Sequence, residues 1–206
     1  MSLPLARPLP VDTFPALRPL ALSPPSFGPS PGPTRLRVPD LMHATDQAAD
    51  AVLSGRCDRL LPEGGLPESC RWFTRIHGDD ELDVWLISWV PGEPTELHDH
   101  GGSLGALTVL SGSLNEFRWD GKALRRRRLE AGDQAGFPLG WVHDVVWAPR
   151  TVTGSSAGPA GARNSPTLSV HAYSPPLTAM SYYEVTHRNR LRRRRTELTD
   201  HPEGAS

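Results

Sequence analysis

From Cys70 onward, the chain is divided into short segments in which apolar and polar residues alternate with a period of two. Gly, Pro, Asp or Asn separates the segments, and branched and aromatic residues are frequent within them. Many short strands at this spacing are typical of an all-β sandwich or barrel. We therefore expect an all-β fold, with one further strand after a turn near the C-terminus. The alternating segments are CRWFTRI, DVWLISWV, LGALTVLSG, SLNEFRWDG, KALRRRRLEAG, DQAGFPLG, HDVVWA, TLSVHAYS and SYYEV.

Two segments of different composition precede the predicted strands. Residues 1–34 are rich in Pro, Ser and Gly, and we expect them to be disordered because proline removes hydrogen-bond donors and fixes φ. Residues 40–55 have helical periodicity, with Asp40 as the predicted N-cap and Gly55 as the predicted end. The apolar positions of this short helix are Leu41, Ala44, Ala48 and Val52.

The length of 206 residues favours a single folded domain. We expect this domain to span residues 35–196, between the proline-rich segment and a flexible tail at residues 197–206. Within the domain, residues 151–166 (TVTGSSAGPAGARNSP) are mostly small and polar, which predicts a flexible loop between two strands.

Charge and hydropathy argue against several classes of function. The formal net charge is -1 at pH 7, which gives no overall attraction to nucleic acid or to an anionic membrane. We interpret the arginine runs at 125–128 and 192–195 as solvated strand faces, because no aromatic residues interleave with them. No segment approaches the ~18 consecutive apolar residues of a membrane span. We expect neither a nucleic-acid nor a membrane partner.

The cysteines and the N-terminus predict the compartment. Cys57 and Cys70 are too few for a disulfide scaffold, so we interpret them as reduced thiols, although one bridge is an alternative. The N-terminus lacks the continuous apolar segment of a secretory signal. Its arginines could fit a transit peptide, but its prolines oppose the amphipathic helix of such peptides. We expect a cytoplasmic protein.

The stretch GEPTELHDHGGSLG places His98 and His100 one residue apart. Residues i and i+2 of a strand point to the same face, so both imidazoles would face one side. A lone histidine is more often a surface or core residue, but an H-x-H pair can bind a metal ion together with a third ligand. Three neutral imidazoles suit iron and zinc alike, so a triad alone does not select the metal.

The spacing around these histidines resembles the two motifs of the cupin superfamily, G-x5-H-x-H-x(3,4)-E-x6-G and G-x5-P-x-G-x2-H-x3-N. The resemblance implies a small, jelly-roll-like β-barrel that binds a metal inside, with His98, His100 and His143 as its ligands. Gly105 replaces the motif glutamate, and Trp147 replaces the final asparagine. The other matching residues are Gly92, Gly112, Gly132, Pro138 and Gly140.

Loss of the glutamate leaves three histidines, as in thiol dioxygenases, and other segments are similar to the cysteine dioxygenases. The run ISWVPGEPTELHDHGGSLGALTVLSGSLNE resembles their iron-site segment, and WFTR resembles the segment that carries their substrate-binding arginine, here Arg75. The run SVHAYSPPL resembles their signature and contains Ser169, His171 and Tyr173. The resemblance covers roughly residues 40–195 and implies Fe(II) as the cofactor.

The same resemblance implies roles for these residues. Ser169 would hold His171, His171 would orient Tyr173, and the phenol would hydrogen-bond the substrate or iron-bound oxygen. Arg75 would bind the substrate carboxylate through a bidentate fork. From residue types alone, the Ser-His-Tyr alternation could instead form an ordinary polar outer face, and Arg75 could be an exposed charge.

Three positions depart from family patterns. Gly105 stands where some members have a cysteine that crosslinks to the tyrosine, so the resemblance is to the bacterial type without that crosslink. Phe73 stands where some relatives have a tyrosine near the arginine. Trp147 leaves one supporting hydrogen bond of the second motif unaccounted for, which could lower the affinity for iron.

The resemblance implies an enzyme that oxidises L-cysteine with O₂ to cysteine sulfinic acid. L-cysteine would bind through its thiolate and amine, and we expect a monomer. One alternative is a dioxygenase of another small thiol, such as 3-mercaptopropionate. A second is a non-catalytic metal-binding cupin, and a third is a zinc or nickel isomerase-type cupin, which would not explain the S-x-H-x-Y run.

Overall fold

The computed structural model describes residues 34–149 and 165–202, all of which belong to one compact unit. The predicted disordered segment 1–34 lies outside the described residues apart from Thr34. The predicted loop 151–166 also lies outside them, apart from its last two residues. In the described part of the chain, no helix is long and apolar enough to cross a membrane.

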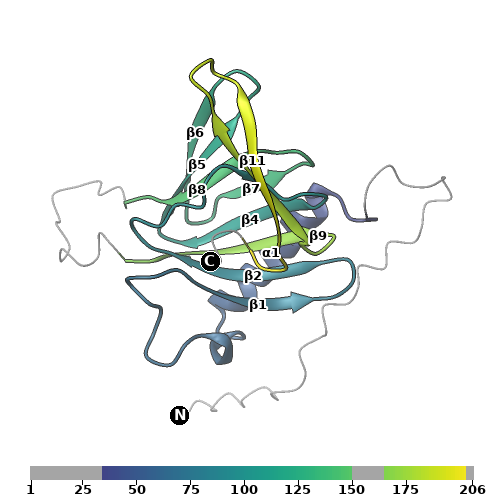
Figure 1. Cartoon of the computed structure of the whole chain (residues 1–206). Coiled ribbons are helices and arrows are strands. Elements are labelled where there is room, and N and C mark those ends of the chain that lie inside the picture. Colours follow the sequence, from purple (N-terminus) through teal and green to yellow (C-terminus); the bar gives the residue numbers. More distant parts are fainter. Residues whose placement is uncertain (1–33, 150–164, 203–206) are drawn as a thin grey trace, which may run out of the picture. The chain divides into compact units, whose positions relative to one another are not determined.

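Two antiparallel sheets form the body of the described part of the chain (Figure 1). The first sheet consists of β1 (Trp72–Gly78), β2 (Asp83–Trp89), β9 (Thr167–Ser174), β4 (Leu104–Ser111) and β7 (Gln134–Phe137), in that order. The second consists of β11 (Leu191–Leu198), β10 (Ala179–Val185), β3 (His98–Asp99), β8 (His143–Trp147), β5 (Ser113–Trp119) and β6 (Leu124–Glu130), in that order. Outside the sheets are the helix α1 (Val38–Leu53) and the 3₁₀ turn η1 (Asp58–Leu60). The predicted all-β cupin barrel with a short N-terminal helix is confirmed.

The main core lies between the two sheets, because its buried side chains come from strands of both. Trp89 is fully buried there, and the partly buried Trp141 packs against this core. The core residues are Trp85, Ile87, Trp89, Leu107, Val109, Leu114, Leu129, Ala135, Phe137, Val145, Tyr173, Leu177 and Met180.

A second apolar cluster joins α1 to the outer face of the first sheet. Leu41 and Ala48 of the helix pack there with residues that include Leu86 of β2, Ala106 of β4 and Ala172 of β9. Every residue of β2 is therefore buried, since the barrel interior covers one face and α1 covers the other. This explains why DVWLISWV is apolar almost throughout instead of alternating strictly.

The prediction of Asp40 as the N-cap of α1 is wrong. The helix begins at Val38, and Arg37 occupies the N-cap position. Pro39 is compatible with this earlier start, because a proline in the first turn loses no helical hydrogen bond. The Asp40 carboxylate instead accepts a hydrogen bond of 2.7 Å from the backbone N–H of Arg37. Gly55 follows the helix with a φ of 78°, as expected of a C-terminal glycine.

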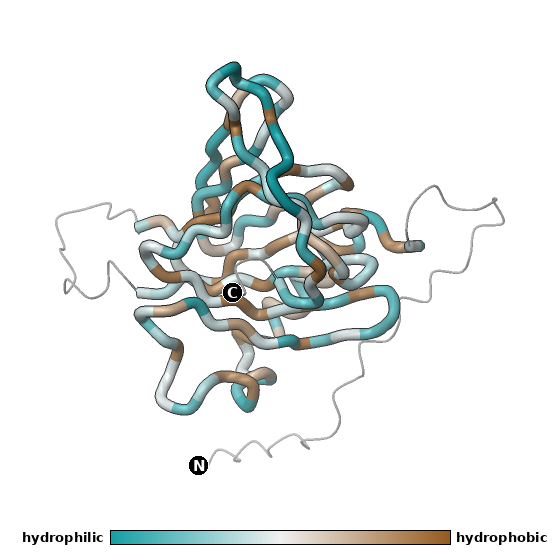
Figure 2. The backbone as a smooth tube through the Cα atoms, viewed as in Figure 1, coloured by the Kyte–Doolittle hydropathy of each residue, from teal (hydrophilic) through white to brown (hydrophobic). Residues whose placement is uncertain are grey.

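The two arginine runs lie on the edge strands β6 and β11, as solvent-facing residues. Figure 2 shows hydrophilic colours along the β10–β11 hairpin. Acidic neighbours pair with both runs, as in the contacts of Arg125 with Asp120 and of Arg192 with Glu184. The predicted tail at 197–206 begins inside β11, which continues to Leu198.

Candidate metal centre

The three predicted ligands meet inside the barrel. His98 in β3 lies directly opposite His143 in β8, so both side chains project from the same face of the second sheet. His100 follows two residues after His98. All three are buried, and their ligand atoms lie within 4.8 Å of one another. These residues form a group that could hold one metal ion.

In two of the three imidazoles, a hydrogen bond to Nδ1 determines that Nε2 is the nitrogen that faces the cluster. The Nδ1 of His98 donates to the backbone carbonyl of Glu96 over 2.9 Å, because a carbonyl oxygen can only accept. The Nδ1 of His143 lies 3.1 Å from Oε1 of Glu116. Both rings therefore direct Nε2 into the cluster, where Nε2 of His143 lies 3.5 Å from Nε2 of His100. Such partners fix the orientation of metal-binding imidazoles.

Glu116, in β5, is fully buried, and no sequence motif predicted its place at the site. It accepts hydrogen bonds from the indole N–H of Trp141 at 3.0 Å and from the guanidinium of Arg127. Burial raises its pKa, but the contacts with His143, Trp141 and Arg127 outweigh this and lower the pKa to about 2. The carboxylate is therefore ionised and orients His143. The sequence carries one signal for this role: Glu116 lies two residues after Leu114, so this charged residue shares the inward face of the strand.

Asp99, between the two histidines, points to the opposite side of β3 and fixes this short strand. Its carboxylate accepts from the backbone N–H of Gly101 at 2.9 Å and from the hydroxyl of Tyr183 at 2.6 Å. Gly101 has a φ of 59°, and an added Cβ would lie 2.8 Å from the carbonyl oxygen of Ala179. The H-D-H-G sequence thus combines two candidate ligands with the turn that positions the second of them.

A row of hydrogen-bonded side chains runs along β9 beside the histidines. The indole N–H of Trp89 donates to the Ser169 hydroxyl at 2.7 Å, and this oxygen lies 3.0 Å from Nε2 of His171. The Nδ1 of His171 lies 3.2 Å from the hydroxyl of Tyr173. The Tyr173 ring lies 5.1 Å from the His100 ring, centre to centre. All four residues are fully buried, so they do not form a polar outer face.

Arg75 lies on the inward-facing side of β1, at the edge of the first sheet. Its register partners across the sheet are Trp85 and then His171, so the three side chains share one face. The guanidinium lies 4.5 Å from the Trp85 ring centre, and its Nε lies 3.5 Å from Oδ1 of Asp83. Asp83 is directly opposite Tyr173. Arg75 therefore lies two strands away from the Ser169–His171–Tyr173 row in the same sheet, on the face that this row also uses.

A sequence model described as "Cysteine dioxygenase type I" matches residues 67–138, a segment that includes Arg75, His98 and His100. The resemblance to the cysteine dioxygenase family is confirmed. The match supports a dioxygenase-type enzyme of the thiol dioxygenase kind, and the histidine cluster supplies a candidate metal site within it.

Several solved structures show partial likeness to this chain. KdgF from Halomonas sp. is 17% identical, with 52% of this chain and 82% of that chain covered and a TM-score of 0.40. A cupin superfamily protein from Desulfitobacterium hafniense is 13% identical, with coverages of 55% and 94% and a TM-score of 0.40. A recombinant oxalate oxidase in complex with glycolate is 14% identical, with coverages of 59% and 59% and a TM-score of 0.43.

Gly105 is the position at which cysteine dioxygenases of the crosslinked type have their cysteine. It lies directly opposite Tyr173 in the sheet. An added Cβ would lie 3.0 Å from the Phe137 ring and 3.3 Å from Nδ1 of His100. Glycine therefore lets the His100 imidazole approach the sheet next to Tyr173.

Trp147 stands at the position of the cupin asparagine, but its indole N–H points to a backbone group and not to the triad. This N–H donates to the backbone carbonyl of Ser165 at 3.2 Å, and the ring packs against the main core. Glu116 supplies the hydrogen bond that orients His143. The lower iron affinity expected from Trp147 stays a prediction.

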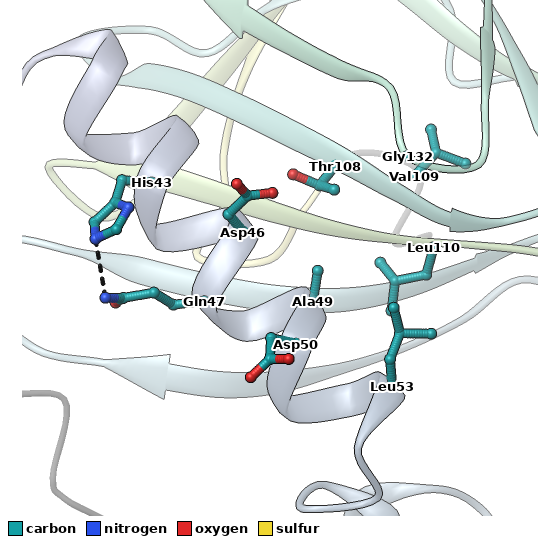
Figure 3. Close-up of a pocket in the computed structure, with 10 residues that line it drawn as sticks. All are labelled: His43, Asp46, Gln47, Ala49, Asp50, Leu53, Thr108, Val109, Leu110 and Gly132. Carbon is teal, nitrogen blue, oxygen red and sulfur yellow. Dashed lines mark hydrogen bonds between the residues drawn. The ribbon is translucent and has the colours of Figure 1, made fainter.

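A separate groove lies between α1 and β4 (Figure 3). Its lining includes Asp46 and Asp50 of the helix and Leu110 of the strand. Its lining residues include none of the triad or of the Tyr173 row, so it is not an entrance to the candidate metal centre.

Proposed function

We propose that this protein is an iron(II)-dependent thiol dioxygenase that converts L-cysteine and O₂ into cysteine sulfinic acid. The observation that carries this proposal is the buried histidine triad packed against the hydrogen-bonded Ser169–His171–Tyr173 row. Both oxygen atoms of O₂ are added to the sulfur, which is oxidised while O₂ is reduced. Atoms and electrons balance without another co-substrate.

The triad has the chemistry that a non-haem iron site needs. Three neutral imidazoles leave the full charge of a divalent ion uncompensated, which favours binding of an anionic thiolate. Iron(II), when bound, would supply a centre at which the thiolate and O₂ can react, with sulfur as the net source of the electrons. We assign His98, His100 and His143 as its ligands, with Glu96 and Glu116 orienting two of them.

Tyr173 is proposed as the catalytic side chain that contacts substrate. The Trp89 indole can only donate, so Ser169 accepts from it and can use its own proton toward Nε2 of His171. His171 then carries its proton on Nδ1 and donates to the Tyr173 oxygen. This direction leaves the phenolic proton of Tyr173 to point into the site. His171 and Ser169 act as positioning residues.

Arg75 is proposed to bind the substrate carboxylate. Its guanidinium has five N–H donors in a planar fork, which suits bidentate binding of a carboxylate. Asp83 and the Trp85 ring hold the side chain on the inward face of β1, where it stays 43% exposed. The carboxylate of a short thiol acid would then extend toward β1 while its sulfur lies at the triad.

We also propose that the protein acts as a cytoplasmic monomer without nucleic-acid or membrane partners. Cys57 and Cys70 are both free thiols, as in proteins of reducing compartments.

Oxygen uptake by iron(II)-loaded protein tests the proposal, with L-cysteine and 3-mercaptopropionate supplied separately. We expect uptake with L-cysteine. An Arg75→Ala variant should retain its iron and require at least tenfold more cysteine for half-maximal rate, whereas His143→Ala should lose iron. Uptake only with 3-mercaptopropionate would refute the cysteine assignment, and wild-type kinetics in Arg75→Ala would refute the role of Arg75. Iron-loaded protein that oxidises neither thiol would favour a binding cupin.

A further inference from the structure

The chain after β11 crosses the open edge of the barrel. β1 and β11 are edge strands of different sheets, and residues 199–202 connect the end of β11 to the face of β1 and β2. In Figure 1, β11 (yellow) descends from the top of the view toward β2. The backbone N–H of Thr199 donates to the carbonyl of Thr178 at 3.1 Å. The Thr199 hydroxyl accepts from the N–H of His201 at 3.1 Å, which closes a tight turn.

This C-terminal turn, defined as residues 199–202, contacts Arg75, which is proposed to bind the substrate carboxylate, and two aromatic residues beside it. The carbonyl oxygen of Asp200 accepts a hydrogen bond of 3.1 Å from Nη2 of Arg75. The His201 ring lies 5.8 Å from the Phe73 ring and 6.0 Å from the Trp85 ring, centre to centre.

The two residues of the turn that face Arg75 and the aromatic rings, Asp200 and His201, also contact each other. Nδ1 of His201 lies 2.8 Å from Oδ1 of Asp200, which limits rotation of the imidazole. Pro202 is buried, although His201 itself is half-exposed. The half-exposed imidazole is thus held against two aromatic rings, next to the residue whose backbone carbonyl accepts from Arg75.

We propose that Asp200 and His201 form the outer wall of the substrate pocket and restrict it to short thiol acids of cysteine length. This inference rests on the proposed function, because it requires that Arg75 binds a carboxylate. The Asp200 carbonyl uses one donor of Arg75 and fixes the plane of its fork. The His201 ring then limits how far a carboxylate can lie from the triad while still reaching that fork.

A pocket wall of this kind discriminates by length. One additional methylene separates L-homocysteine from L-cysteine, and a well-formed pocket distinguishes such pairs by about 10–200-fold. The wall at His201 is half-exposed and formed by a single ring, so we expect a value near the lower limit. Removing the imidazole should weaken this discrimination without changing the ligands of the metal.

The experiment measures anaerobic binding of L-cysteine and L-homocysteine to iron(II)-loaded protein by calorimetry. Wild type, His201→Ala and the matched control His187→Ala are compared, since His187 is an exposed histidine in the β10–β11 turn. We expect wild type and the control to prefer cysteine by about tenfold or more. In His201→Ala this preference should fall at least threefold, with unchanged iron content.

The two failures are distinguishable. If wild type binds cysteine but His201→Ala keeps the same preference, the wall is refuted and the proposed function stands. If wild type with bound iron binds neither thiol, the proposed function fails and the wall fails with it. A loss of preference in the control as large as in His201→Ala would also refute the assignment, because it would not depend on the C-terminal turn.

Discussion

At the scale of single residues, the candidate site depends on side chains that orient the ligands as much as on the ligands. The sequence motifs predicted His98, His100 and His143, because residue spacing along a motif is local information. Glu116 was not predicted, since its contact with His143 joins residues 27 positions apart and depends on the pairing of β5 with β8. The hydrogen bond of Trp89 was not predicted either, although its indole N–H begins the row that ends at Tyr173.

The role of Glu116 gives a direct prediction. Glu116→Gln keeps the size of the side chain but removes the charge that accepts the Nδ1 proton of His143. Loss of such a partner typically weakens metal affinity about 10–100-fold, and we expect a decrease in this range when iron(II) binding is measured by competition with a chelator. Glu184→Gln is the matched control, because Glu184 lies on the partly exposed strand β10 and pairs with Arg192 of β11, away from the triad. Equal affinities in the two variants would contradict the role of Glu116.

At the scale of elements, the strands were predictable because period-two alternation reflects burial on one face. The ends of elements were less predictable, as the start of α1 shows. Asp40 is a good N-cap type, but Pro39 suits the first turn, so the helix begins before it. In the sequence, the two-residue strand β3 could be recognised only by its histidine pair. The turn after β11 has no sequence signal, because it is defined by contacts between distant segments such as Phe73 and His201.

The attachment of α1 to the first sheet can be tested by truncating its buried face. Leu41 is completely buried in the cluster that joins the helix to β2, β4 and β9, whereas Leu53 is 70% exposed. Leu41→Ala should lower the free energy of unfolding by about 2–5 kcal/mol, because it leaves a cavity. Leu53→Ala should change it by no more than about 0.5 kcal/mol. Urea denaturation measures both, and similar values for the two variants would show that α1 does not pack as described.

At the scale of the whole molecule, the two sheets bring the histidine triad and the Ser169–His171–Tyr173 row into one interior, with Arg75 at its edge. His98 and His143 come from the second sheet and His100 directly follows β3, whereas Tyr173 and Arg75 come from the first sheet. The fold class and these positions followed from sequence patterns and resemblance. The contacts of residues 199–202 with β1 and β2 could not be predicted from the sequence, because they depend on how the two sheets are placed.

Metal binding should therefore stabilise the entire folded unit. An ion that binds only the folded state at a free concentration of 100 times its Kd adds about 2.7 kcal/mol of stability. For a chain of this length, this corresponds to a rise in Tm of roughly 5–10 °C. Anaerobic thermal melts with and without iron(II) measure this rise. A His98→Ala, His100→Ala double variant should show none, and an equal rise in that variant would place the binding site elsewhere.

The measurement that tests the central claim most directly is mass analysis of the product formed from L-cysteine under ¹⁸O₂ by iron(II)-loaded protein. We expect cysteine sulfinic acid in which both added oxygen atoms are ¹⁸O, formed by wild type and not by the double histidine variant. Product that carries one ¹⁸O atom, or formation of cystine alone, would contradict a dioxygenase that uses this triad.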